Sequence, residues 1–361
     1  MDDGWMAYVC GDECNHANTG AVKETVNKYD NAVGYYREEV DAVLWIAKDR
    51  ISNVFVDVYD RIIDILAMMQ LPDVTAFQAE RYYQEIVELL QDNEKHKQYV
   101  SKVTEIVTNG QEAVIAATLM MYPNVIIFSM GSKPARVRSP NIRRPSKDEF
   151  TTGNSYGGQS LQDLIEATSA DTLTRVFRGM IDNFTLQDFN AKDWVRKING
   201  YIDSIDNALE NISTTEIEAT TRRVATSINR LNSGLVTGYR RVAVVDNKTC
   251  VGCLTLHGKV YATNDEFESH PRCRCILVPI TMTWMEYASV RGGAVPDYMS
   301  RDELIGMMPD AVLRDILGPG RYAMYEAGLP LERMIYIEQT AEYGHLIRIT
   351  PLSVLREQGI P

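Results

Sequence analysis

The sequence predicts an α+β protein that is mainly α, and three observations support this prediction. Apolar residues recur at steps of three and four through long stretches of the N-terminal half, as one face of a helix requires. Stretches rich in β-branched residues follow Gly234. Four of the six cysteines fall between positions 250 and 275, beside these stretches. We therefore expect an N-terminal helical bundle, a helical segment and a small β-containing domain stapled by zinc.

Long helices are predicted from about Val22 to Ala116. The first apolar stripe consists of Val40, Val43, Leu44, Ile46, Ala47, Ile51, Val54, Phe55, Val58, Ile62, Ile63 and Leu66. It should end at Leu71-Pro72-Asp73, because proline lacks a backbone N–H and disfavours helix in the residue before it. A second stripe consists of Ile86, Leu89, Leu90, Val100, Val103, Ile106 and Val107. These stripes are typical of an antiparallel bundle, and residues 1–130 form the first predicted domain.

Residues 131–160 are rich in Gly, Ser, Pro and Asn and are predicted to form a linker. Within fifteen of these residues there are six basic side chains and no acidic one: Lys133, Arg136, Arg138, Arg143, Arg144 and Lys147. Such a run is typical of a solvated, extended linker. It would equally suit an arm that neutralises DNA phosphates or an acidic partner surface.

Helical periodicity resumes at Leu161, continues from Trp194 to Leu209, and begins again at Ser213, which has the capping-box spacing to Glu216. Strands are expected over 239–245 and 275–283. Residues 161–283 therefore form the predicted metal-binding domain, and residues 284–361 a C-terminal extension.

Composition narrows the possible functions. The formal net charge is −12, so the whole chain does not coat nucleic acid by charge, and any contact with DNA is local. The first twenty residues lack the basic start and apolar run of a signal peptide. The apolar stretch 113–130 is interrupted by Tyr122-Pro123-Asn124, so we predict no membrane-spanning segment.

The cysteine cluster has the spacing of a metal site. Cys250 and Cys253 leave the two-residue gap of a zinc knuckle, in which Gly252 would free the backbone for a tight turn. His270 and Cys273 leave the same gap, and Cys275 would face the same side as Cys273 in an extended segment. Three donors thus compete for two places, with His270 and Cys273 favoured and Cys275 as the alternative to His270.

Four protein donors around zinc leave no open coordination position, so the site is predicted to be structural rather than catalytic. Zinc suits thiolate and imidazole donors, although iron can use them too. His257 is a weaker candidate because it lies in a predicted turn. Cys10, Cys14 and His16 could form part of a second site, and buried thiols beside a surface histidine are the alternative to any metal.

The motifs resemble those of the phage Mu F-like minor head, or head morphogenesis, proteins. The resemblance rests on Thr249-Cys250-x-x-Cys253, Leu256-x-Gly258-Lys259 and His270-Pro271-x-Cys273-Arg274-Cys275. Upstream, the helix containing Arg222 and Asn229 is similar to the one that precedes the cysteines in that family. Downstream, Gly318-Pro-Gly-Arg321 and Arg348-Ile-Thr-Pro-Leu352 are similar to segments near its end. Two departures are His257, where an acidic residue is common, and the long basic linker.

The resemblance implies a structural virion protein without enzymatic activity that acts in capsid assembly. Its implied partners are the portal protein, capsid or scaffold proteins and packaged DNA, with no membrane. Its implied location is the capsid interior near the portal vertex, and the host cytoplasm during assembly.

Two other function classes remain open at this point. A zinc-ribbon DNA-binding protein fits the cluster but not the net charge. A zinc enzyme fits less well, since there is no HExxH and the deaminase pattern is broken. Glu266 and Glu268 resemble the paired glutamates of ADP-ribosyltransferases, but two acids in a polar loop are usually solvated.

Overall fold

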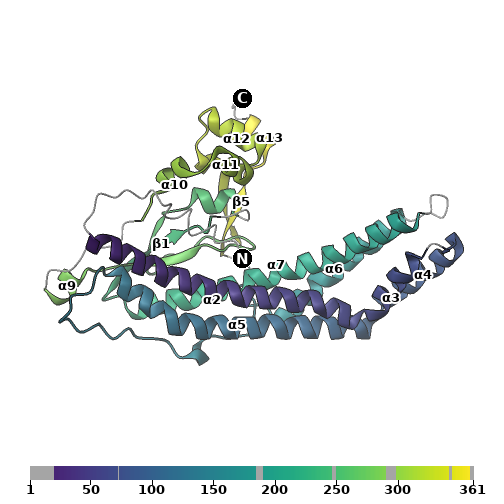
Figure 1. Cartoon of the computed structure of the whole chain (residues 1–361), viewed down its shortest axis with the longest axis horizontal. Coiled ribbons are helices and arrows are strands. Elements are labelled where there is room, and N and C mark those ends of the chain that lie inside the picture. The colour runs from purple at the N-terminus through teal and green to yellow at the C-terminus, as the bar shows by residue number, and fades with distance from the viewer. Residues whose placement is uncertain are drawn as a thin grey trace. The chain divides into compact units, whose positions relative to one another are not determined.

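Helices make up most of the chain, and the small sheets lie in its C-terminal part, so the protein is α+β and mainly α, as predicted. The computed structural model describes residues 20–71, 73–183, 190–245, 249–289, 298–340 and 344–357. The long helices come first (Figure 1): α2 (Gly20–Val58), α3 (Asp60–Met69), α4 (Ala76–Leu90), α5 (Asn93–Ser129), α6 (Leu161–Asn183) and α7 (Ala191–Leu231).

The remaining elements are short. They are η1 (Lys147–Glu149), β1 (Val236–Val242), α8 (Val251–Thr255), β2 (Val260–Ala262), β3 (Ile276–Thr281), α9 (Trp284–Ala288), α10 (Arg301–Met307), α11 (Asp310–Leu317), α12 (Pro319–Glu326), η3 (Leu331–Met334), β4 (Ile335–Thr340), β5 (Gly344–Ile349) and α13 (Leu352–Glu357).

The chain divides into two compact units, each made of alternating stretches of sequence. The first contains residues 1–40, 114–150 and 218–361, and the second contains residues 41–113 and 151–217. The helices α2, α5 and α7 each continue from one unit into the other. The predicted boundaries at 130, 160 and 283 divide the chain differently, because a change in composition marks the gaps between helices rather than positions within them.

The second unit is a helical bundle with a continuous apolar core. Most residues of the predicted stripes are buried along one side of each helix, including Ile51, Phe55, Ile62, Ile86 and Val103. Ile46 and Ile63 are exceptions and are exposed. As predicted, a helix ends before Pro72: α3 stops at Met69 and α4 begins at Ala76. There, the side-chain oxygen of Thr75 accepts the Gln78 N–H in a capping box.

Two predictions about helix ends are wrong. α5 continues through Pro123, and the neighbouring Tyr122 hydroxyl is held at 3.0 Å from both Leu277 O and Asn229 Nδ2, so tertiary contacts outweigh the break. α7 continues through Ser213, which is therefore not an N-cap. Instead, the Glu216 carboxylate accepts the Tyr156 N–H at 2.6 Å.

α5 is the one described helix that is long and apolar enough to cross a membrane by length and composition alone. The expectation of no such segment rested on a break at Pro123, which the structure does not show. Of the most apolar 18-residue stretch of α5, 44% is buried within the protein. Burial of this kind is also typical of a core helix.

The basic segment is largely irregular, and η1 is its only helical turn. All six basic side chains are exposed. The backbone is nevertheless held, because Asn232 bonds to both the N–H and the carbonyl of Arg143, at 2.9 and 2.8 Å. At the start of the segment, Trp284 Nε1 donates to Gly131 O at 3.0 Å.

The first unit contains an antiparallel sheet in the order β2-β1-β3 and a separate β4-β5 hairpin. In the central strand β1, Tyr239 lies opposite Tyr261 and Arg241 lies opposite Leu277. Apolar residues of α8 share one core with α10 to α13, including Leu254, Leu304, Leu317 and Leu355. The predicted C-terminal extension therefore packs on the element that carries the Cys-x-x-Cys motif.

Candidate metal centre

The first pair of cysteines lies at the start of α8. Cys250 is the N-cap residue, and its Sγ accepts the backbone N–H of Cys253 at 3.3 Å, so the two-residue gap places both sulfurs on one side of the turn. Gly252 has helical backbone, and its predicted role in freeing the turn is wrong. It is required for space instead, since a Cβ there would lie 2.6 Å from Cγ2 of Ile347.

The second pair of donors lies in a β-turn. The N–H of Cys273 donates to the carbonyl of His270 at 3.0 Å, with Pro271 and Arg272 in the central positions. Arg272 adopts a positive φ of 61°, as the third residue of a type II turn does. Cys275 follows two residues later and is buried with Cys273, as predicted for an extended segment.

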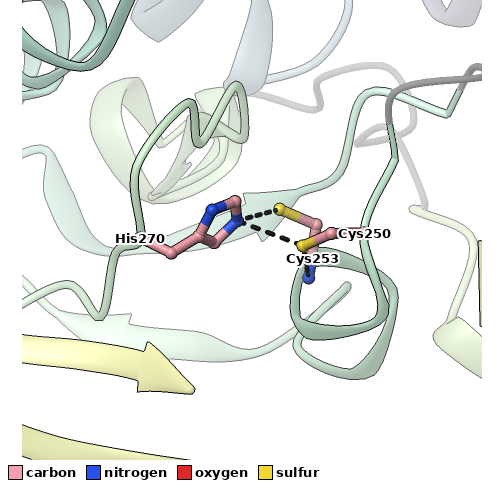
Figure 2. Close-up of side chains that lie close together, drawn as sticks. All are labelled: Cys250, Cys253 and His270. Atoms are coloured by element: carbon pink, nitrogen blue, oxygen red, sulfur yellow. Dashed lines mark hydrogen bonds between the residues drawn. The ribbon is translucent and has the colours of Figure 1, made fainter. Parts of the chain in front are cut away.

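His270 reaches across to the first pair. Its Nε2 lies 3.2 Å from Cys250 Sγ and 3.0 Å from Cys253 Sγ, and Figure 2 shows the ring edge facing both sulfurs. The other ring nitrogen, Nδ1, lies 2.7 Å from the carbonyl oxygen of Pro271. Because a carbonyl only accepts, Nδ1 carries a proton, and Nε2 is the nitrogen available to a metal.

The five predicted donors form two overlapping groups that share Cys253. One contains Cys250, Cys253 and His270, and the other contains Cys253, Cys273 and Cys275; the ligand atoms within each lie within 4.8 Å of one another. The sulfurs of Cys253 and Cys273 are 3.9 Å apart. Tetrahedral zinc, with Zn–S of about 2.3 Å and Zn–N of about 2.0 Å, separates its ligand atoms by about 3.5–3.8 Å. The cluster could therefore hold a metal ion.

The electrostatics favour the thiolate form of two cysteines, Cys250 and Cys273. The hydrogen bond with Cys253 lowers the pKa of Cys250 to about 4, and the hydrogen bonds with Cys253 and Cys275 hold the pKa of Cys273 well below its usual value. Burial raises the pKa of Cys275 to about 12. Burial lowers the pKa of His270, but hydrogen bonds with Cys250 and Cys273 outweigh it and raise the pKa to about 10. Thiolate is the form of cysteine that binds metal.

Two buried arginines lie beside the cysteines, and the sequence did not identify either as a site residue. Arg241 Nη2 lies 3.4 Å from Cys273 Sγ and 3.8 Å from Cys253 Sγ. Arg222 Nη1 donates to the carbonyl of Cys273 at 2.7 Å. The signal for Arg241 was a charged residue at a position of β1 that the strand's alternation turns inward.

His257 is a structural residue. Its Nδ1 accepts the Ala243 N–H at 3.1 Å, and its Nε2 lies 3.2 Å from the carbonyl of Met299. Both ring nitrogens are thus taken by backbone, and burial lowers its pKa to about 4. It lies in a turn, as predicted, and is not among the grouped donors.

The other candidate residues are not brought together with the cluster. Glu268 is bonded to Lys259 and to the Tyr261 hydroxyl, whereas Glu266 pairs with His345 at 3.2 Å. The two glutamates thus serve different partners. Cys10, Cys14 and His16 lie outside the described residues.

The chemistry that this arrangement allows is metal binding by sulfur and imidazole at a buried position. The donors come from the start of α8 and from the turn and extended segment before β3, and a bound ion would connect these parts. Comparison with protein-family models, with curated proteins and with solved structures finds no match to this chain.

Proposed function

We propose that this chain is a phage minor head protein, and that a structural zinc ion holds α8 and the segment before β3 together within the first unit. The proposal is supported above all by one observation: the motif that resembles the Mu F-like proteins, Cys-x-x-Cys followed by His-Pro-x-Cys-x-Cys, brings its donors into two overlapping groups of ligand atoms that share Cys253. The cysteines and the histidine of that motif are the residues that form the cluster.

Zinc suits the donor set. Three thiolates and one imidazole are a common structural zinc set, and the sulfur–sulfur and sulfur–nitrogen distances of 3.0–3.9 Å lie near those around a tetrahedral ion. The ligands proposed are Cys250, Cys253, His270 and Cys273. The geometry at His270 favours it over Cys275, because the Nδ1 contact with Pro271 O turns Nε2 toward the sulfurs.

A structural role follows from the ligand count and the burial. Four protein donors leave no position for water or substrate, which a catalytic zinc requires. Cys253 and Cys273 are buried, so the ion would lie in the protein interior. It would join α8 to the segment before β3, where so short a stretch of chain has little apolar core of its own.

The proposed place of the protein is inside the phage head, near the portal vertex. The portal protein is the proposed main partner, together with capsid or scaffold proteins during assembly in the host cytoplasm. The six exposed basic side chains of the 131–160 segment offer a local surface for packaged DNA, despite the net charge of −12. No catalytic role is proposed.

The test is the fate of the protein and of a phage that lacks it. Purified particles should contain the protein, and it should co-sediment with isolated portal. A deletion phage should build heads but yield few plaques per particle, because assembly quality and not head formation is affected. If the protein is absent from particles and cleaves DNA in a zinc-dependent manner, the zinc-enzyme alternative replaces this proposal. If the protein is absent from particles and binds DNA with an affinity that falls steeply as salt rises, the zinc-ribbon DNA-binding alternative is favoured.

A further inference from the structure

Arg241 is a fully buried cation, with 0% of its surface exposed. It lies in β1, the central strand of the sheet, and its backbone N–H and carbonyl bond to Lys259 O and Gly258 N. A charge taken out of water without a partner is costly, so a buried guanidinium requires anions or several acceptors nearby. The question is which groups balance its charge.

Among the described residues, no carboxylate pairs with Arg241. The nearest candidate, Glu268, gives its carboxylate to Lys259 and Tyr261, and only its backbone carbonyl accepts from Arg241 Nη1, at 2.7 Å. The guanidinium carbon lies 4.4 Å from the centre of the Phe267 ring, which is a weak partner for a whole charge. Other neighbours are the sulfurs of Cys253 and Cys273, and Cys275 and the Tyr261 hydroxyl also interact with the guanidinium.

We propose that Arg241 is the counter-charge of the metal centre and a positioning residue for its thiolates. A dication with three thiolates and a neutral imidazole carries a net charge of −1, which a single guanidinium neutralises. With Cys275 in place of His270 the centre would carry −2, and the same arginine would leave a buried negative charge. The single positive charge of Arg241 therefore favours a ligand set of three sulfurs and one imidazole over a set of four sulfurs. This inference rests on the proposed zinc site.

Arg222 does not have this role, although it is also buried beside the cluster. Its guanidinium donates to backbone and hydroxyl oxygens, at Cys273 O and Ser269 Oγ, and lies 3.7 Å from the Glu218 carboxylate. Glu218 also pairs with Arg37 at 2.7 Å. These contacts orient the turn that carries His270 and Cys273.

The test compares Arg241→Gln and Arg241→Lys with the parent, with Arg240→Gln as the matched control. Arg240 is the adjacent residue of β1 and lies over the Tyr298 ring, so its loss removes the same charge from the other side of the strand. Zinc affinity is measured by competition with a chelating dye. Co²⁺ is then substituted, and the sulfur-to-cobalt charge-transfer band is recorded.

Arg241→Gln should weaken zinc binding by about ten- to a hundredfold, as the loss of other groups that contact metal ligands does. Its cobalt band should move to longer wavelength, because electrons on sulfur are less stable without the nearby cation. Arg241→Lys should change both quantities in the same direction but less, and Arg240→Gln should change neither. If Arg241→Gln does not fold, the shift of the cobalt band in Arg241→Lys alone decides whether Arg241 acts on the thiolates.

Unchanged affinity and an unchanged band in folded Arg241→Gln, or an unchanged band in Arg241→Lys, would show that Arg241 only fills space. Failure of the parent chain to bind zinc would instead refute the proposed site on which this inference rests, so the two failures are distinguishable.

Discussion

Gly252 of the Cys-x-x-Cys turn lies closely against Ile347 of the β4-β5 hairpin, since a Cβ on Gly252 would lie 2.6 Å from Cγ2 of Ile347. The contact is reinforced nearby, where Ile347 N–H donates to Ser269 O at 2.6 Å, directly before His270. The hairpin is therefore built onto both halves of the metal centre.

Gly252→Ala should destabilise the protein by about 1–3 kcal/mol, the usual effect of overpacking, although alanine favours helix more than glycine does. Gly252→Ala with Ile347→Leu should recover most of this, because leucine has no methyl group on Cβ. Gly306→Ala in α10 is the control, since a Cβ there meets nothing within 4 Å. Thermal unfolding measures all three, and equal effects at both glycines would contradict the close approach.

Removal of the metal with a chelator should increase hydrogen exchange in α8, in the 269–275 turn and in the β4-β5 hairpin. The core of the helical unit around Ile62 and Ile86 should keep its protection, because it is a separate apolar cluster. Cys253→Ser should have the same effect without a chelator. Uniform loss of protection over both units would show that the ion does not act locally.

Asp206 should make the helical unit less stable as the pH rises. Burial, with Asp203 and Glu210 nearby, raises its pKa to about 7, although the Tyr99 hydroxyl at 3.4 Å acts in the opposite direction. An unfolded aspartate titrates near 3.9, so this stability is full below about pH 4 and is lost as the pH rises through about 7. Asp206→Asn should therefore raise the unfolding temperature relative to the parent at about pH 8 but not at about pH 4. A gain of equal size at both values would rule out titration as its cause.

Replacing Arg136, Arg138, Arg143 and Arg144 with Gln should weaken DNA binding in low salt and reduce its dependence on salt. Thermal stability should stay the same, because these side chains are exposed and the bonds of Asn232 are to the backbone of Arg143. The control replaces Arg61, Lys97, Arg175 and Arg196, which are exposed, carry the same charge and lie in the helical unit. If both quadruple variants bind DNA alike, the basic segment is only a solvated linker.

The helical stripes and the metal donors could be predicted from sequence because each depends on local spacing. Ile51, Phe55 and Ile62 recur at helical steps, and Cys250 to Cys253 spans one turn. The continuity of α5 through Pro123 could not be predicted, because it is stabilised by Tyr122 contacting residues more than a hundred positions away. The same applies to Arg241, whose charge is balanced by sulfurs that only the fold brings near, and to Gly252, whose neighbour Ile347 comes from the last strand.

X-ray absorption at the zinc edge of the purified protein tests the closed zinc centre directly, with the metal content measured on the same sample. We expect one zinc per chain with three sulfurs at about 2.3 Å, one nitrogen at about 2.0 Å and no bound water. A coordination shell with an oxygen in the fourth position would contradict a closed structural centre, and so would a chain that carries no zinc.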